Sequence, residues 1–377
     1  MTHKFKFGIE EEMFLASART RMVPRSPVKA FHKAAEKRLK SVERELLQNQ
    51  VEICTEPSES FAEAREALLG LRTGLAEIGR KHGLVVFASG THPTALWPEQ
   101  RETEKARYED MMDDLQIVGR RSVVCGLHIH VEVPRPEARV DLMRRLFPFL
   151  PILLALSTSS PFWEKRRTGL HGYRLRAYAE LPRTGLPELF EDEADYQHYV
   201  NGMTKAGAVK DATYFWWHIR PSTRFPTLEL RVADSCTRLD DTIAIAAVYR
   251  CLVRLVDRRR DLNARLSGAS RGFVMENLWR AERSGIHATL IDEATLSAVA
   301  FHEAVAGLLD LIAEDAAALG CEAECERVRI IARDGSSADG QIAAFEGALK
   351  DGKNERQALS SVVDWLAEQT AGGPMAS

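Results

Sequence analysis

The chain has 377 residues and carries 51 Lys and Arg residues against 54 Asp and Glu residues, which gives a formal net charge of −3. This balance excludes a basic protein that holds a nucleic-acid backbone by charge alone. A hydrophobic content of 45% and a charged content of 28% exclude a disordered acidic chain and are typical of a globular protein with a large core.

The N-terminal part alternates predicted strands with predicted helices. Hydrophobic periodicity assigns strands to residues 4–15, 46–55, 84–89, 123–133, 214–220 and 227–232, and helices to residues 60–83, 99–114, 136–156 and 186–205. Ser60 and Glu63 have the spacing of a capping box at the start of the first of these helices. Residues 157–187 are rich in Ser, Arg, Gly and Pro and are predicted to be a loop.

The sequence changes character after residue 240. A helix is predicted over residues 240–262, and the rest is rich in Ala, Leu and Glu with helical spacing. No strong strand is predicted after Val232. The pattern predicts an α+β fold. We expect one catalytic domain over residues 1–377, with a sheet-bearing core in 1–235 and a mostly helical part in 236–377 packed on it, because no flexible linker separates them.

Targeting and redox features are few. No apolar signal segment follows Met1, and the longest apolar stretch, residues 146–156, contains two prolines and is too short to cross a bilayer. We expect a cytoplasmic protein with no membrane partner. Six cysteines suggest no disulfide framework. Cys321 and Cys325 lie one helical turn apart, but no neighbouring Cys or His pair completes a metal site, so we interpret both as small helix residues.

Four predicted strands carry polar side chains on one face and apolar side chains on the other, since residues i and i+2 of a strand share a face. The polar positions are Glu10 and Glu12 in the first strand, Glu52 in the second, His128, His130 and Glu132 in the third, and Glu229 and Arg231 in the fourth. The same alternation places Glu11 on the apolar side, where the sequence leaves open either an ion pair or a bulge.

A polar face of this kind is usually a solvated face. Solvated faces are mostly filled with Lys, Thr, Ser and Gln, however, whereas these positions are mainly Glu and His, and like-charged Glu side chains repel each other across strands. Carboxylate oxygens with an imidazole suit Mg²⁺ or Mn²⁺. Any one strand favours the solvated face, but the four together favour a metal site.

Arginines are frequent around these strands, and their planar guanidinium groups suit phosphate and carboxylate. Arg220 and Arg231 are the strongest candidates, because each alternates with apolar residues in a predicted strand. An acidic, metal-loaded face surrounded by arginines suits nucleotide-driven phosphoryl transfer. Neither a P-loop nor a Rossmann fingerprint is present, so ATP would have to bind to another kind of scaffold.

Five segments resemble the bacterial carboxylate–amine ligases, also called glutamate–cysteine ligase family 2, of the glutamine synthetase superfamily. The resemblance runs in consistent order from about Phe7 to Ala246. The segments are Gly8 to Glu12, Val51 to Thr55, Cys125 to His130, Ser159 to Trp163, and Arg220 to Ser222 followed by Pro226 to Arg231. It implies a curved antiparallel sheet whose polar face holds ATP and Mg²⁺ (or Mn²⁺), with helices on the other face.

The resemblance also implies roles for single residues. Glu10, Glu12, Glu52, His128 and Glu229 would be metal ligands, and all five were also selected by the strand alternation. Arg231 would contact phosphate or an acyl phosphate, and His130 would line the nucleotide or substrate site. Arg220 and Arg174 would be further anion-binding residues.

The implied reaction is ATP-dependent amide formation between a carboxylate and an amine through an acyl phosphate. Glutamate or a similar amino acid is the expected acid, a weak glutamate–cysteine ligase activity is compatible with it, and the amine stays open. The expected partners are these small molecules, with no nucleic acid, and a homo-oligomer stays open. A phosphotransferase on the same scaffold is the main alternative. A metal-dependent hydrolase, suggested by His128 and His130, and a non-catalytic binding protein are further alternatives.

Overall fold

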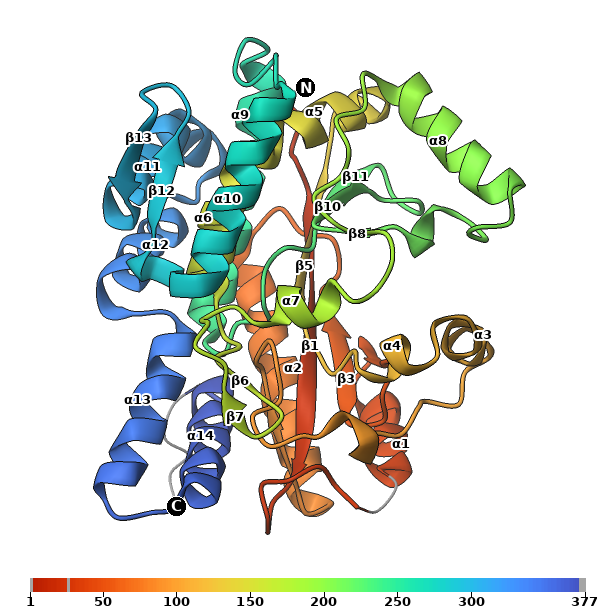
Figure 1. Cartoon of the computed structure of the whole chain (residues 1–377), viewed down its shortest axis with the longest axis vertical. Coiled ribbons are helices and arrows are strands. Elements are labelled where there is room, and N and C mark those ends of the chain that lie inside the picture. The colour runs from red at the N-terminus through yellow and green to blue at the C-terminus, as the bar shows by residue number, and fades with distance from the viewer. Residues whose placement is uncertain (1–2, 26–27, 373–377) are drawn as a thin grey trace.

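The computed structural model describes residues 3–25 and 28–372, and its central element is a seven-stranded antiparallel sheet in this part of the chain (Figure 1). The strand order is β10-β11-β5-β1-β3-β2, and β4 pairs with the second half of β1. The strands are β1 (Phe7–Ser17), β2 (Val42–Arg44), β3 (Gln50–Cys54), β4 (Leu84–Phe87), β5 (Leu127–Glu132), β10 (Ile219–Pro221) and β11 (Thr227–Leu230).

Helices cover one face of this sheet. The central one is α9 (Leu239–Arg258), which is buried along most of its length between β5 and α2 (Phe61–Lys81) on one side and α11 (Phe301–Leu319) and α12 (Glu322–Asp334) on the other. The apolar side chains of β1 and β5, such as Ile9 and Ile129, join the same core cluster as α9. The alternation read from the sequence therefore separates a buried face from a polar face.

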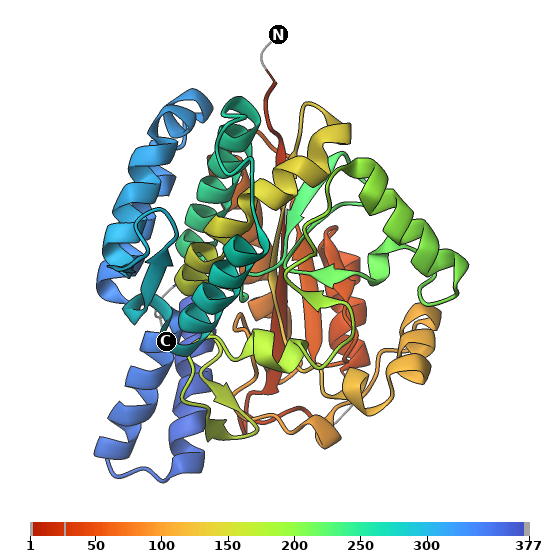
Figure 2. The same cartoon turned by 45° about the horizontal axis from the view of Figure 1, so that its top comes forward.

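The remaining helices lie around this core. They are α1 (Lys29–Arg38), α3 (Ala106–Leu115), α4 (Ile117–Arg120), α5 (Arg139–Leu146), α6 (Leu150–Ser157), α7 (Arg174–Tyr178), α8 (Glu193–Lys205), α10 (Gly268–Ser284), α13 (Ser337–Lys350) and α14 (Glu355–Thr370). In Figures 1 and 2 the C-terminal helices lie to one side of the sheet, and α3 and α8 lie to the other. Among the described residues, no helix is both long enough and apolar enough to cross a bilayer.

Three small sheets complete the structure as described: β6 (Phe162–Trp163) with β7 (Arg166–Arg167), β8 (Thr184–Gly185) with β9 (Trp216–Trp217), and β12 (Thr289–Asp292) with β13 (Ser297–Ala300). The prediction of no strand after Val232 is therefore wrong. The β12–β13 hairpin is short and largely exposed, and its Ala-rich second strand has no alternation that distinguishes it from the helices around it.

Some predicted helices begin later than expected or are interrupted, at prolines or at capping side chains. The helix expected over residues 136–156 is divided into α5, a 3-10 turn at Phe147–Phe149 and α6, because prolines lie at the start of the last two elements. α8 begins at Glu193 because the Asp192 carboxylate accepts a hydrogen bond from the Asp195 N–H and caps the helix. At α2 the Ser60 cap is confirmed, but the Glu63 side chain pairs with the Ser58 hydroxyl instead of closing a capping box.

Glu11 forms an ion pair on the apolar side of the sheet. Its carboxylate receives two hydrogen bonds from Arg72 of α2, at 2.6 and 2.9 Å, and one from the Thr242 hydroxyl at 2.7 Å. Both charged side chains are 0% exposed. The first of the two alternatives left open for this residue is therefore confirmed, and β1 pairs in regular register through it.

Candidate active site

A cavity of about 780 Å³ opens over the polar face of the sheet. All nine residues to which the resemblance assigned roles line it: Glu10, Glu12, Glu52, His128, His130, Arg174, Arg220, Glu229 and Arg231. The strand register explains the convergence, because Glu10 pairs with His128, Glu12 with Glu52, and Glu229 with His130. Side chains paired in this way across neighbouring strands lie on one face of the sheet.

Two groups of potential metal ligands lie within this cavity. The Glu–His–Glu cluster consists of Glu10, His128 and Glu229, and the triple-Glu cluster consists of Glu12, Glu45 and Glu52. In each cluster one ligand atom from every residue lies within 4.8 Å of the others. Six ligands in two adjacent groups could hold two divalent cations.

The triple-Glu cluster concentrates negative charge in a buried place. Burial, together with the charges of Glu45, Glu10 and Glu12, raises the pKa of Glu52 well above its ordinary value. Burial and the Glu45 charge raise the pKa of Glu12 to about 7, although the Gly126 N–H donates to its Oε2 at 2.6 Å. A cation would relieve this repulsion, as the acidic composition of the face led us to expect.

His128 connects the two clusters. Its Nδ1 lies 3.4 Å from Glu10 Oε2, and its Nε2 lies 3.8 Å from Glu12 Oε1. Burial and the nearby Arg231 charge lower the pKa of His128 to about 4, so the ring is neutral near pH 7. Its Nε2 is buried without a hydrogen-bond partner in the described structure. A neutral imidazole nitrogen beside carboxylates is suited to a metal ion.

Glu10 is ionised because two histidines face it. Burial alone would raise the pKa of Glu10, but hydrogen bonds from His128 and His130 outweigh burial and lower it. His130 has partners on both nitrogens, since Nε2 lies 3.3 Å from Glu10 Oε1 and Nδ1 lies 3.0 Å from the Thr227 hydroxyl. His130 therefore holds Glu10 in place.

Glu229 is held by two arginines. Arg220 donates to both of its oxygens, at 2.7 and 3.1 Å, and Arg231 donates to Oε1. Burial alone would raise the pKa of Glu229, but the two guanidinium charges lower it well below its ordinary value. A cation at Glu229 would thus share this carboxylate with Arg220 and Arg231.

Arg174 is a buried cation of a different kind. Its guanidinium donates to the carbonyls of Arg231 and Ala233 at 3.2 and 3.1 Å and lies over the Tyr178 ring. Its charge partly offsets the burial that raises the pKa of Glu12, and its Nε is buried without a partner among the described residues. It lies so close to Gly126 that an added Cβ would be 2.2 Å from its Nη2, so a larger residue there would displace the guanidinium. An anionic substrate group would balance this charge.

Two parts of the cavity were missed by the sequence reasoning. Glu45 lies just before the strand predicted over residues 46–55, where no alternation could place it, and Tyr178 lies in the segment predicted to be a loop. The Tyr178 hydroxyl accepts a hydrogen bond from Arg231 at 3.4 Å. The only local indication that Glu45 belongs to an acidic cluster was a second glutamate two residues earlier, Glu43.

The raised pKa of Glu12 predicts a pH dependence of cation binding. A proton must leave this carboxyl before it can bind a metal, so the affinity for Mg²⁺ should rise as the pH rises through about 7. Below that pH the slope should reach about tenfold per unit for one displaced proton. Titration calorimetry at a series of pH values measures it. Glu12→Gln removes both the titrating carboxyl and one proposed ligand, so it should bind Mg²⁺ more weakly and with a smaller pH slope. An affinity independent of pH would contradict the assignment.

The raised pKa of Glu12 also predicts how the stability of the metal-free protein depends on pH. Because the folded pKa lies above the ordinary value of 4.5, Glu12 contributes stability that is complete below about pH 4.5 and is lost as the pH rises through about 7. Thermal unfolding of the metal-free protein should therefore show a contribution from Glu12 that falls over this range, and Glu12→Gln should remove it.

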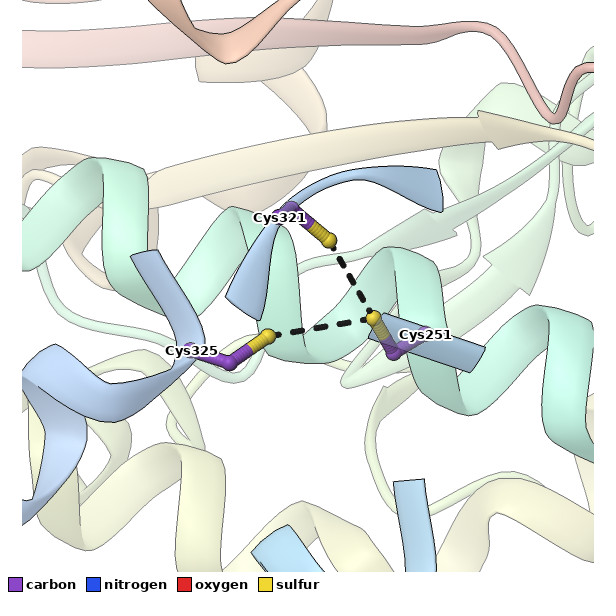
Figure 3. A group of neighbouring side chains, drawn as sticks. All are labelled: Cys251, Cys321 and Cys325. Carbon is purple, nitrogen blue, oxygen red and sulfur yellow. Dashed lines mark hydrogen bonds between the residues drawn. The ribbon is translucent and has the colours of Figure 1, made fainter. Parts of the chain in front are cut away.

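Three thiols meet outside the cavity (Figure 3). Cys251 Sγ of α9 lies 3.5 Å from Cys321 Sγ and 3.8 Å from Cys325 Sγ, at the start of α12. Mutual hydrogen bonds and burial raise the pKa of Cys251, which keeps this thiol protonated. No fourth His, Cys, Asp or Glu ligand joins the group in the described part of the chain. Sequence reasoning found Cys321 and Cys325 but not Cys251, and the group packs α12 onto α9.

The family model and the relatives that match this chain carry the same family name. The family model "Glutamate-cysteine ligase family 2" matches residues 6–364. A protein of Bradyrhizobium diazoefficiens, provisionally named glutamate–cysteine ligase 2, is 43% identical over 374 residues, covering 98% of this chain and 85% of that protein. A Rhodospirillum rubrum protein with the same provisional name is 44% identical over 371 residues, covering 97% and 95%.

The fold also has a close counterpart among solved structures. The crystal structure of glutamate–cysteine ligase from Francisella tularensis in complex with AMP has a TM-score of 0.71 to this chain, covering 97% of this chain and 89% of that one. At 13% sequence identity the likeness is one of fold. The α+β fold with an antiparallel sheet and a helical C-terminal region is thereby confirmed.

Proposed function

The chain belongs to glutamate–cysteine ligase family 2, and from this membership we propose that it joins a carboxylate to an amine through an acyl phosphate made from ATP. The family is one of ATP-dependent ligases that form carbon–nitrogen bonds. The observation that carries the finer proposal is the meeting of two acidic clusters with the guanidinium groups of Arg174, Arg220 and Arg231 in one cavity.

The two acidic clusters are the proposed site of Mg²⁺ or Mn²⁺. Their donors are mostly carboxylate oxygens, which these cations prefer, and the unpartnered Nε2 of His128 lies beside them. Burial and neighbouring carboxylates raise the pKa values of Glu12 and Glu52, which a bound cation would lower. Bound there, divalent cations would neutralise phosphate oxygens during phosphoryl transfer.

The arginines are the proposed anion-binding groups. Arg174 and Arg231 each have a buried Nε without a hydrogen-bond partner in the described structure, and both line the cavity. Such donors would stabilise charge that develops on a phosphoryl or carboxylate oxygen. Arg220 keeps Glu229 oriented, and His130 keeps Glu10 oriented, so we propose both as positioning residues.

The proposed reaction has two steps. An oxygen of the substrate carboxylate attacks the γ-phosphorus of ATP, the bond to ADP breaks, and an acyl phosphate forms. The nitrogen of the amine then attacks the acyl carbon, phosphate leaves, the amine loses a proton, and an amide forms. Glutamate or a similar amino acid is the proposed acid, in keeping with the names of the relatives. The protein contributes mainly positioning and charge stabilisation.

A screen of acid and amine pairs with Mg²⁺ or Mn²⁺ tests the reaction. ADP and free phosphate should appear in equal amounts, and only when both an acid and an amine are present. Hydroxylamine in place of the amine should give a hydroxamate, because it traps an acyl phosphate. A stable phosphorylated product without free phosphate would instead identify a phosphotransferase, and product formation without ATP would identify a hydrolase.

Arg174 offers a variant that tests the anion-binding role. Arg174→Gln should lower kcat/KM by about 10²- to 10³-fold, the usual effect of removing one donor aimed at developing charge. Arg166→Gln, an exposed position in the neighbouring strand β7, is the matched control and should leave kcat/KM unchanged. Equal activity of the two variants would remove Arg174 from the proposal.

A further inference from the structure

Two histidines and one aspartate from distant parts of the sequence meet outside the cavity over the polar face of the sheet, where we propose that ATP binds and which we call the ATP cavity. His171 precedes α7, His287 ends a 3-10 turn at Gly285–His287, and Asp339 lies in the first turn of α13. His287 Nε2 lies 2.8 Å from Asp339 Oδ1, and His171 Nε2 lies 3.4 Å from the same oxygen. One ligand atom from each of the three residues lies within 4.8 Å of the others. We call this group the His–His–Asp cluster.

A second contact holds the other side of the two half-buried ligands, His171 and Asp339. Asp339 Oδ2 accepts hydrogen bonds from the N–H and the hydroxyl of Ser336, both at 2.9 Å, which leaves Oδ1 directed to the histidines. His171 Nδ1 lies 3.3 Å from the Arg283 carbonyl oxygen. A carboxylate or carbonyl that fixes the far side of a ligand in this way is typical of metal sites.

The hydrogen bond to Arg283 has a consequence for His171. A carbonyl oxygen can only accept, so Nδ1 must carry the proton. In a neutral ring the lone pair of Nε2 then faces Asp339 Oδ1, and two lone pairs at this distance repel each other. The contact is favourable only with a positive charge between the two atoms, either a proton or a metal ion.

The donor set favours a metal ion of the zinc class. Two imidazole nitrogens and one carboxylate oxygen with an open fourth position are a common zinc arrangement. Ligands about 2.0–2.1 Å from a tetrahedral ion lie about 3.3–3.4 Å apart, as His171 and Asp339 do. The shorter contact of His287 can lengthen, because this side chain is 61% exposed and also leaves the cluster open to solvent.

We propose that His171, His287 and Asp339 bind a zinc-class divalent transition-metal ion at a site separate from the ATP cavity. The ion would join the start of α13 and the turn before β12 to the segment that leads into α7. The His171 backbone is already fixed there, since its N–H donates to the Glu282 carbonyl and its carbonyl accepts from the Ser160 N–H. Three residues further on, Arg174 enters the cavity, so the ion would stabilise the segment that positions this arginine.

Cobalt and zinc titrations of the metal-free protein test the site. Saturating Mg²⁺ is present throughout to occupy the acidic clusters. Co²⁺ should bind with the visible absorption of a four-coordinate ion, one equivalent of Zn²⁺ should displace it, and Zn²⁺ should raise the melting temperature. His287→Ala should weaken Zn²⁺ binding by about a hundredfold or more, since even the outer partners of metal ligands are worth 10- to 100-fold.

His302→Ala, which removes an exposed histidine of α11, is the control and should bind both ions as the wild type does. Asp339→Asn is a second ligand variant that keeps the size of the side chain. Wild-type affinity in both ligand variants, or no Co²⁺ binding to the wild type once Mg²⁺ is saturating, would overturn the site. These readouts require no ligase turnover, so failure of this site and failure of the proposed function are distinguishable.

Discussion

Glu52→Gln is expected to reduce ADP formation by about 10²- to 10³-fold and, at the same time, to stabilise the metal-free protein. The loss of activity follows because the amide cannot supply the negative charge that a cation needs in the triple-Glu cluster. The gain in stability follows because the Glu52 carboxyl is buried beside Glu45, Glu10 and Glu12, which raises its pKa well above the ordinary value. A neutral amide removes this repulsion without changing the size of the side chain.

The two effects have opposite signs, so one variant separates a functional residue from a structural one. Differential scanning calorimetry without metal should show an increase of about 1–3 °C, the shift that a change near 1 kcal/mol produces in a large domain. Adding Mg²⁺ and ATP should then stabilise the wild type more than the variant. Glu137→Gln, which removes the same charge at an exposed position, is the control and should change neither quantity.

Two outcomes would contradict this account. Wild-type turnover in Glu52→Gln would remove Glu52 from the proposed metal ligands. A lower melting temperature would mean that its carboxylate is stabilised in the free protein by a counter-charge, against the electrostatics of the triple-Glu cluster.

Glu11→Gln should destabilise the protein strongly and leave the chemistry of the folded enzyme intact. The variant leaves the Arg72 guanidinium buried without its counter-charge, which typically costs about 3–5 kcal/mol. Arg72 would keep its hydrogen bonds to the carbonyls of Cys236 and Thr237, at 2.8 Å each, but these carry no net charge. Because Glu11 points away from the cavity, KM for ATP should not change.

The matched control is Glu77, which lies on α2, the helix that carries Arg72. Glu77 pairs with Arg38 at 2.6 Å, but both side chains are substantially exposed, so Glu77→Gln should cost less than about 1 kcal/mol. Denaturant unfolding measures both variants. The double variant Glu11→Leu with Arg72→Met should recover part of the loss, since no buried charge remains. A cost for Glu11→Gln as small as that for Glu77→Gln would show that the buried pair is not important for stability.

The polar face could be predicted because its signal is local. Side chains alternate with a period of two along any strand, so Glu10, Glu12, Glu52, His128 and Glu229 could be grouped without knowing how the strands pair. Their position in one cavity follows from strand register, and the structure places all five there. Their role as metal ligands stays a prediction, which the Glu52 variant and the pH titration address.

Other features could not be predicted from neighbouring residues in the sequence. Glu45 lies beside Glu12 and Glu52 only because β2 and β3 fold against β1. The β12–β13 hairpin was missed because its Ala-rich second strand has no strong periodicity. Arg174 was selected by resemblance alone, since its segment has the composition of a loop.

Periodicity and composition by themselves determined that the chain is an α+β protein and which face of the four site-bearing strands is polar, because these properties depend on neighbours within a few positions. Tertiary structure alone decided which charges meet. Glu11 and Arg72 are 61 positions apart, and His171 is 116 positions from His287 (287 − 171). Coulomb forces and metal coordination act over a few ångströms of space, and no local pattern in a sequence encodes that distance.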